Sequence, residues 1–320
     1  MNILEKFQTV IILLAVGVGL LLGQFIFFEQ NAQSFIIPFL LLMLYGLFLT
    51  IPLHHLKDAF KNIKFLSVST IINFVWTPLL AWGLGAIFLT DHPALWIGFI
   101  MLMVTPCTDW YLMFTSIAKG NVSLSTSVLP INLILQVLLL PVYLFIFAGT
   151  IQSVPISTII ESIVLVLVIP FTLAHLTRYL LRNKITFLNK KLVPFFSSAQ
   201  IIFLSLAITA MFASQGNYLI NNLEVIYILI IPILLYFVIN FLVARTVGKA
   251  MKFSYEDTVS LSLTIIARNS PVSLAIAVTA FPDQPLISLA LVVGPLIELP
   301  VLAIVAQILL SLRKKQLNKN

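Results

Sequence analysis

The sequence is poor in charge and in cysteine. Of its 320 residues only 9% are charged, whereas soluble domains typically carry about 25%. The single cysteine, Cys107, excludes an internal disulfide framework and any zinc site built from several cysteines. Apolar residues instead make up 60% of the chain, and the mean hydropathy is +1.10. A chain of this length cannot hide so much apolar surface from water, so we predict that a lipid bilayer surrounds most of it.

Basic residues outnumber acidic ones, and the net charge is +7. This excess does not indicate a nucleic-acid partner, because the basic residues lie at the ends of apolar segments and do not alternate with aromatic residues. With the N-terminus inside and ten spans, all of the 18 basic residues except Arg268 fall on the inner side. The positive-inside rule therefore predicts a multi-pass protein of the cell membrane with both termini in the cytoplasm.

Ten segments are apolar and long enough to cross a bilayer, which needs about 20 residues per helix. Backbone groups inside hydrocarbon must satisfy one another, so we predict an all-α membrane fold. The first segment is expected to be a retained helix, because no small-residue cleavage site of a signal peptide follows it. The predicted spans are 8–28, 34–53, 65–90, 93–118, 122–148, 157–180, 192–214, 224–248, 254–281 and 286–312.

The ten spans divide into two groups of five, residues 1–149 and 150–320, with no soluble domain between them. Because five is odd, the second half enters the membrane in the orientation opposite to the first. We therefore predict two inverted five-helix repeats in a single membrane domain, an arrangement common in secondary transporters. The fourth and ninth spans support this prediction, because each carries a polar, proline-containing interruption, at 105–109 and at 268–271.

Three charged residues, Asp109, Arg268 and Glu298, lie inside predicted spans. An ionised group at the bilayer centre costs at least about 2.5–3.5 kcal/mol, so these side chains should face the protein interior or a wet cavity. Such residues mark ion or substrate routes, although a purely structural buried network is the alternative. Asp109 and Glu298 are the candidates for ion coupling, with Glu298 as a proton carrier.

Pro106 and Pro271 are predicted to break their helices. A proline lacks the N–H group, and its ring opposes the carbonyl four residues earlier, which belongs to Leu102 for Pro106 and to Ala267 for Pro271. Freed carbonyls and half-helix ends form ion and substrate sites in transporters. The predicted substrate-binding residues surround these breaks and are Cys107, Thr108, Asp109, Arg268, Asn269, Ser270 and Glu298.

The remaining intramembrane polar residues are expected mainly to form hydrogen bonds between helices; they are Asn73, Asn132, Gln136, Gln200 and Asn240. Metal binding is not expected at His54 and His55, which adjoin a lysine-rich inner loop, and no cofactor is expected. An enzyme is disfavoured, because the chain lacks a His-Glu-x-x-His motif and a lone intramembrane aspartate does not form a protease dyad.

Several motifs resemble those of the bile acid:sodium symporter superfamily. Residues 105–108 (Thr-Pro-Cys-Thr), followed by 118–121 (Ala-Lys-Gly-Asn), are similar to its fourth span, and the Pro-Cys-Thr step resembles its arsenite-efflux, or arsenical-resistance, branch. Residues 274–278 (Leu-Ala-Ile-Ala-Val) and 293–301 (Val-Gly-Pro-Leu-Ile-Glu-Leu-Pro-Val) are similar to the ninth and tenth spans of that branch. In length and ten-span layout the resemblance covers the whole chain.

The resemblance implies a panel of spans one, two, six and seven, and a core of spans three to five and eight to ten. In that core the broken fourth and ninth helices cross. It also implies that Cys107 and Glu298 take the roles of the cysteine and the glutamate of the arsenite-efflux branch. Trivalent arsenic is thiophilic and largely uncharged at neutral pH, so a soft thiol and a titratable carboxyl suit proton-exchanged efflux.

The chain departs from the sodium-coupled symporters at the positions of their sodium ligands. Tyr111 and Leu112 stand at those positions in the fourth span, and Ile266 and Ser270 in the ninth. Because most of the oxygen ligands are missing, sodium coupling is not expected.

Asp109 and Arg268 are departures from the arsenite-efflux branch. If the broken helices cross, these two side chains should approach each other. We hypothesise that the guanidinium is a built-in cation in the region where relatives bind sodium, and that losing one partner of the pair would cost several kcal/mol. Alternatively, the Arg268 guanidinium binds an anionic substrate group through two parallel hydrogen bonds.

The sequence thus predicts a secondary transporter that is not an enzyme. The leading interpretation is proton-coupled or sodium-independent efflux of arsenite or a related metalloid. The alternative is transport of a small organic anion, as in the bile acid symporters. The expected partners are the small-molecule substrate, protons and the lipid bilayer.

Overall fold

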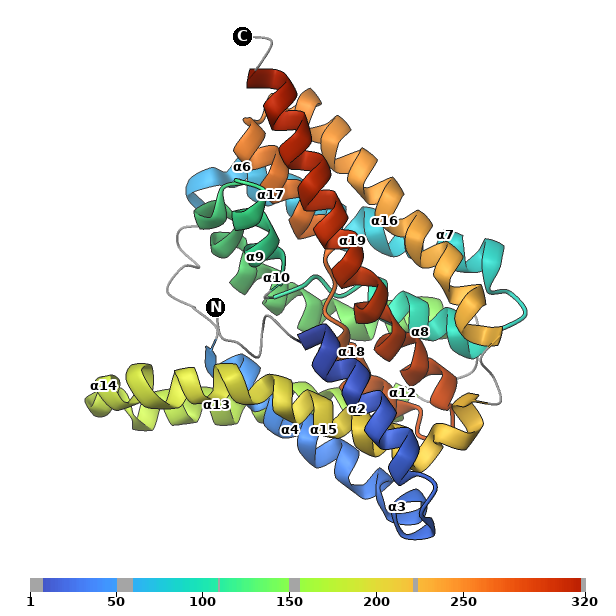
Figure 1. The fold of residues 1–320 in the computed structure, drawn as a ribbon. Helices are drawn as coiled ribbons and strands as arrows, with labels where there is room; N and C mark the ends of the chain where they lie inside the picture. Colours follow the sequence, from blue (N-terminus) through green and yellow to red (C-terminus); the bar gives the residue numbers. More distant parts are fainter. Residues whose placement is uncertain (1–7, 51–59, 109, 150–155, 221–223, 318–320) are drawn as a thin grey trace. The chain divides into compact units, whose positions relative to one another are not determined.

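The computed structural model describes residues 8–50, 60–108, 110–149, 156–220 and 224–317, and every regular element in these ranges is helical (Figure 1). The chain folds into two compact units. Unit 1 comprises Met1–Ile51, Val154–Val225 and Pro271–Val292. Unit 2 comprises Pro52–Ser153, Ile226–Ser270 and Val293–Asn320, so that both units are built from separate stretches of sequence.

The helices are labelled α, and short 3-10 or π-helical stretches are labelled η. Those that lie wholly within unit 1 are α2 (Gln8–Leu22), α3 (Ile26–Asn31), α4 (Gln33–Thr50), α12 (Ile156–Ile163), η5 (Val164–Val168), α13 (Ile169–Leu180), η6 (Arg182–Lys184), α14 (Ile185–Phe187), η7 (Leu188–Leu192) and α15 (Val193–Ile220). Those wholly within unit 2 are η2 (Phe60–Asn62), α6 (Ile63–Ile71), η3 (Ile72–Trp76), α7 (Thr77–Phe88), α8 (Pro93–Met103), α9 (Trp110–Ile117), α10 (Val122–Tyr143), η4 (Leu144–Ala148) and α17 (Tyr255–Ile266). Three helices contain a boundary between the units: α16 (Glu224–Ala250), α18 (Ser270–Ala280) and α19 (Pro285–Leu317).

Seven helical runs are long and apolar enough to cross a membrane: Gln33–Thr50, Phe60–Phe88, Val122–Phe147, Ser157–Leu180, Arg182–Gly216, Tyr227–Ala250 and Pro285–Lys314. Three shorter apolar helices accompany them, Val10–Leu22, Pro93–Met103 and Ser270–Ala280. Large apolar side chains such as Leu21 and Ile87 are exposed on the helix surfaces, as expected where lipid replaces water. The helical membrane fold predicted from composition is confirmed at this level.

The first predicted span, 8–28, is not one continuous helix. Helix α2 ends at Leu22, and α3 begins only at Ile26. Gly23 stands directly after α2, and glycine is the weakest helix former after proline, which favours an end at this position.

Unit 1 is held together by close packing of α15 against α2 and α4. Two glycines allow α2 to approach α15: an added Cβ on Gly19 would lie 2.6 Å from the carbonyl oxygen of Thr209, and one on Gly23 would lie 2.8 Å from that of Ala213. Hydrogen bonds add to this packing, because the Thr209 hydroxyl donates to the carbonyl of Ala15 at 3.1 Å. Small residues at such interfaces are typical of helices that associate in lipid.

This packing gives a matched pair of substitutions in α2. We expect Gly19→Ala to lower the stability by about 1–3 kcal/mol, because the new methyl group meets backbone that cannot move aside. Gly17→Ala should be neutral or stabilising by up to about 1 kcal/mol, since nothing lies within 4 Å of its Cβ position and alanine favours the helix. Thermal unfolding of the purified protein in detergent measures both changes, and equal midpoints would contradict the packing of α2 on α15.

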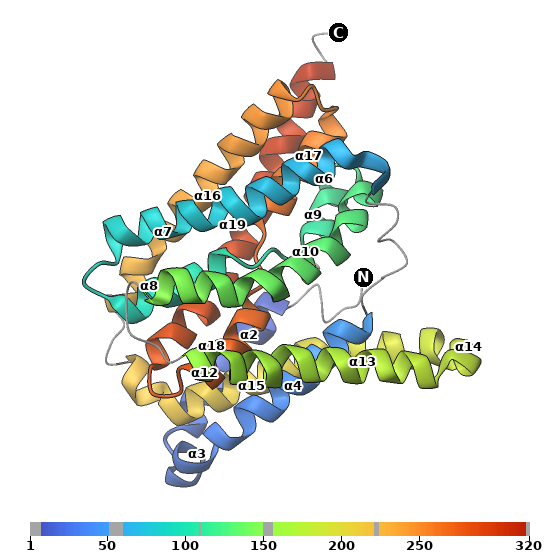
Figure 2. The ribbon, with the colours of Figure 1, turned by 180° about the vertical axis from the view of Figure 1, so that it is seen from behind.

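In unit 2, α6, η3 and α7 form one continuous helical run (Figure 2). The π-helical turn η3 lies near its middle and carries Asn73, and the hydroxyl of Tyr143 from α10 donates to the carbonyl of Phe74 at 2.6 Å. Such π-turns leave backbone groups without regular helix partners and are frequent at functional sites. This one positions the buried Asn73 side chain.

The predicted role of the other polar residues, hydrogen bonding between helices, is confirmed for two of them. The Gln200 amide donates to the hydroxyl of Thr50 at 3.2 Å, and the indole of Trp76 donates to the Asn240 amide oxygen at 3.1 Å. Within the part of the chain that the structure describes, the buried amides of Asn132 and Gln136 have no hydrogen-bond partner. His54 and His55 lie outside the described residues.

Candidate functional site

Two helix interruptions meet inside unit 2. Helix α8 ends at Met103 and α9 begins at Trp110, whereas α17 ends at Ile266 and α18 begins at Ser270. The segments after α8 and α17 pair as an isolated antiparallel bridge between Pro106 and Arg268. The Cys107 N–H donates to the carbonyl of Ala267 at 3.0 Å, and the Asn269 N–H donates to the carbonyl of Thr105 at 2.7 Å. Each interruption therefore donates one backbone N–H to a carbonyl of the other.

The two prolines account for these interruptions, as the sequence predicted. The Ala267 carbonyl, which the Pro271 ring keeps out of a helical hydrogen bond, accepts from Cys107. The carbonyl of Leu102, which Pro106 frees, is one of three carbonyls 3.2 Å from the Thr105 hydroxyl, together with those of Met101 and Asn269, and the hydroxyl has one proton to donate among them. A buried carbonyl without a donor is costly, so these replacement bonds stabilise the broken geometry.

The side chain of Arg268 is enclosed by four oxygen atoms, which we call the Arg268 cage: the carbonyl oxygens of Met103, Ile265 and Ile266 and the Oδ1 atom of Asn73. Nη1 donates to Met103 at 3.0 Å, Nε to Ile266 at 3.3 Å, and Nη2 donates both to Asn73 at 3.1 Å and to Ile265. Four of the five guanidinium N–H groups are thus engaged, and Arg268 is only 3% exposed.

Three of the four cage oxygens are available because they lie at helix ends. Met103 is the last residue of α8, and Ile265 and Ile266 are the last two residues of α17. The last carbonyls of a helix have no donor within it, and they form the negative end of the helix dipole. A cation placed there is stabilised by both helices. The ring of Tyr236 adds a further contact, with its centroid 5.5 Å from the Arg268 Cζ atom.

Glu298 is held beside Arg268 by the backbone. The Arg268 N–H donates to the Glu298 Oε1 atom at 2.8 Å, and Glu298 is 3% exposed. Among the described residues no carboxylate forms an ion pair with the guanidinium, and the ion pair found there joins Arg313 and Glu256. Asp109, which the sequence placed opposite Arg268, lies outside the described residues.

The other predicted site residues gather around the same paired segments. Cys107 is 4% exposed, and Thr108, Asn269 and Ser270 are also buried. The Asn269 amide donates to the hydroxyl of Thr108 at 3.5 Å, and Ser270 begins α18. The structure therefore brings six of the seven predicted substrate-binding residues together in unit 2, where they supply one thiol, one carboxyl, one guanidinium and neutral hydrogen-bonding groups.

Two residues of this site were not predicted as such. Asn73 was assigned to interhelical hydrogen bonding, yet its partner is the Arg268 side chain, which stands 195 positions later in the sequence. Tyr236, whose hydroxyl also donates to the carbonyl of Met103 at 3.2 Å, lies in an apolar helix and was not predicted as a site residue. The signal for Asn73 was a polar residue deep in a span, whereas Tyr236 gave none.

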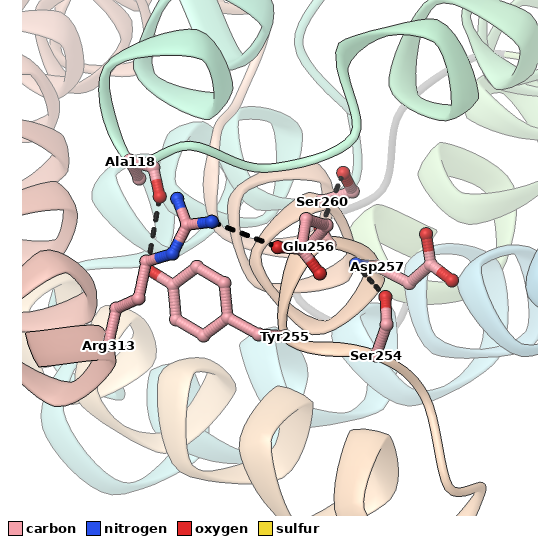
Figure 3. A network of polar contacts seen from close by, with 7 residues as sticks. All are labelled: Ala118, Ser254, Tyr255, Glu256, Asp257, Ser260 and Arg313. Carbon is pink, nitrogen blue, oxygen red and sulfur yellow. Dashed lines mark hydrogen bonds and ion pairs between the residues drawn. The ribbon is translucent and has the colours of Figure 1, made fainter. Parts of the chain in front are cut away.

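A second polar network lies where α17 begins and α19 ends (Figure 3). Arg313 of α19 donates to the Glu256 carboxylate at 3.2 Å and stacks 5.2 Å from the centroid of the Tyr255 ring. The Tyr255 hydroxyl in turn donates to the carbonyl of Ala118, just after α9. Ser254 caps α17 by accepting from the N–H of Asp257 at 3.0 Å. The network joins three helices by their ends and contains none of the predicted site residues.

Comparison with known proteins adds a family match. The model of the family described as Sodium Bile acid symporter family matches residues 37–222. An uncharacterized transporter of Synechocystis sp. is 25% identical over 96% of this chain and 88% of its own length. The arsenical-resistance protein Acr3 of Corynebacterium glutamicum is 26% identical over 94% of this chain and 87% of its own. That of Alkaliphilus metalliredigens is 24% identical over 95% and 91%, respectively.

Proposed function

The chain belongs to the sodium bile acid symporter family, and from this membership we propose that this membrane transporter exports arsenite or a related metalloid by a proton-coupled or sodium-independent route. The observation that carries the proposal is the position of Cys107. The only thiol of the chain is buried at the meeting point of two broken helices, in the same unit as Glu298. A soft thiol is a ligand for trivalent arsenic, and two relatives of similar length are arsenical-resistance proteins.

In the proposed site the substrate is bound by Cys107 together with neutral polar side chains. The uncharged form of arsenite carries three hydroxyl groups. These can form hydrogen bonds with the side chains of Thr108, Asn269 and Ser270. Glu298 is the proposed proton carrier, and Asp109 is the second candidate for ion coupling. Neutral donors and acceptors suit an uncharged metalloid, because they bind it without the cost of burying a further charge.

The contacts of Arg268 support sodium independence. Its guanidinium is held by the protein's own oxygens, so a permanent cation is present beside Glu298. The same contacts disfavour the alternative function, transport of a small organic anion gripped by Arg268. A bidentate grip needs two free parallel N–H groups, and four of the five are engaged.

The proposed architecture has ten spans in two inverted repeats, 1–149 and 150–320, with both termini in the cytoplasm of a cell-membrane protein. The seven long and three shorter apolar helices support a count of ten. Apart from two end residues each of spans two and eight, unit 1 contains the predicted spans one, two, six and seven, and unit 2 contains spans three, four, five and eight, which supports a panel and a core. The ninth and tenth predicted spans each contribute residues to both units.

Transport by the purified wild-type protein in proteoliposomes tests this function. In sodium-free buffer, we expect arsenite to move against its gradient when a pH gradient is imposed, and the flux to stop when the pH gradient is collapsed. The addition of sodium should not change the rate. An arsenite flux no higher than that of protein-free vesicles, together with flux of a bile acid or another carboxylate, would replace the proposal with the organic-anion alternative.

A further inference from the structure

We propose that the Arg268 cage is a cation site filled by the protein's own guanidinium, and that removing the guanidinium opens the site to a free alkali cation such as sodium. The functional meaning of this inference rests on the sodium-independent transport proposed above. The site itself is argued from the contacts within unit 2.

The cage is made of the ligand atoms that small alkali cations prefer. All four are neutral oxygens, three from backbone carbonyls and one from the amide of Asn73. Backbone carbonyl and amide oxygens coordinate hard cations in proteins, and carbonyls from broken helices do so in membrane transporters. They come from α8, from η3 and from α17, so that the ligands are brought together by the fold and not by one loop.

The electrostatic field at the cage favours positive charge even without Arg268. The carbonyl ends of α8 and α17 both contribute to it, and each carries the negative end of a helix dipole. The Arg268 guanidinium also lies over the face of the Tyr236 ring, which attracts cations. The Glu298 carboxyl accepts a hydrogen bond from the backbone N–H of Arg268. Among the described residues, it is the acidic side chain in the hydrogen-bond network of Arg268.

Loss of the guanidinium would leave this field uncompensated. Met103 would keep the hydroxyl of Tyr236 as a donor, but the Ile265 and Ile266 carbonyls and the Asn73 amide oxygen would lose the donors described above. Oxygens in a buried space without donors are strongly destabilising. A small dissociable cation that enters the space would satisfy them, and the protein would then depend on that cation.

The test is thermal unfolding of the full-length wild type and of Arg268→Ala in detergent, with sodium chloride compared with choline chloride at equal ionic strength. For Arg268→Ala we expect a lower midpoint in choline and a saturable rise with sodium, of about 5 °C at a concentration about 100-fold above the apparent Kd. The wild-type midpoint should change by less than about 1 °C. Adding Asn73→Leu to Arg268→Ala should raise the apparent Kd for sodium at least about tenfold, because one ligand is removed.

Arg313→Ala is the matched control, because it removes another arginine of unit 2, one that pairs with Glu256 and stacks on Tyr255. The midpoint of this variant should not respond to sodium.

A sodium response of the wild type equal to that of Arg268→Ala would overturn the proposal, and so would equal midpoints of Arg268→Ala in sodium and choline. If Arg268→Ala yields no folded protein in choline, recovery of a single size-exclusion peak in sodium supports the proposal, and aggregation in both salts overturns it. A wild type that fails to move arsenite refutes the proposed substrate and leaves the sodium response of Arg268→Ala unaffected.

Discussion

Cys107→Ser is expected to lower arsenite transport in proteoliposomes by at least about 100-fold, with the yield of folded protein unchanged. The serine hydroxyl has nearly the same shape as the thiol, but oxygen is a much poorer ligand than sulfur for a thiophilic metalloid. The fold should tolerate the change, because serine is close to cysteine in size and the backbone N–H of residue 107, which links the two breaks, is kept. A 100-fold loss corresponds to about 2.7 kcal/mol of lost stabilisation, the size of one strong ligand contact.

The single cysteine makes a direct control possible. Cys107 is the one thiol that a maleimide can label, and because it is buried, labelling requires the site to open; we expect labelling to inhibit the wild type and arsenite to slow labelling when it occupies the site. Thermal unfolding of Cys107→Ser should give the wild-type midpoint to within about 1 °C. Arsenite flux at the wild-type rate in Cys107→Ser would remove the thiol from the mechanism.

Glu298→Gln is expected to uncouple transport from the pH gradient and to lower the rate at least about tenfold. The glutamine carbonyl can accept the Arg268 N–H as the carboxylate does, so the backbone contact should survive, but an amide cannot carry a proton. The measurement is arsenite flux with and without an imposed pH gradient. Flux that still follows the gradient would exclude Glu298 as the proton carrier.

Glu298→Leu separates the structural role of this residue from the transport role. It removes the acceptor of the Arg268 N–H, so we expect a stability loss of about 1–3 kcal/mol in addition to the loss of transport. Glu298→Gln should stay close to the wild type in thermal unfolding. Equal destabilisation by both substitutions would indicate that the charge of Glu298, and not its hydrogen bond, stabilises the site.

The helix breaks could be predicted from the sequence because proline acts locally. The missing N–H of Pro106 and Pro271 and the clash with a preceding carbonyl are properties of a few consecutive residues. The burial of Arg268 and Glu298 was predictable for a related reason, since a charge inside an apolar span must avoid lipid.

The partners of those residues could not be predicted in the same way. The Arg268 side chain donates mainly to backbone carbonyls. Because every residue has the same backbone carbonyl, the sequence does not indicate that Met103 and Ile265 are the partners. The contact with Asn73 depends on a π-helical turn and on the packing of segments far apart in the chain. The predicted approach of Asp109 to Arg268 stays a prediction.

The network around Arg313 has a consequence for how α17 and α19 can move. Two polar contacts link α19 to α17 and the residues that follow it. Glu298 accepts from the Arg268 N–H, and Arg313 forms an ion pair with Glu256. At 1.5 Å per residue, the two contacts are separated by roughly 22 Å along α19. The contacts of Arg313 with Glu256 and Tyr255 do not involve Glu298, so loss of the Glu298 contact would leave this second link between the two helices in place.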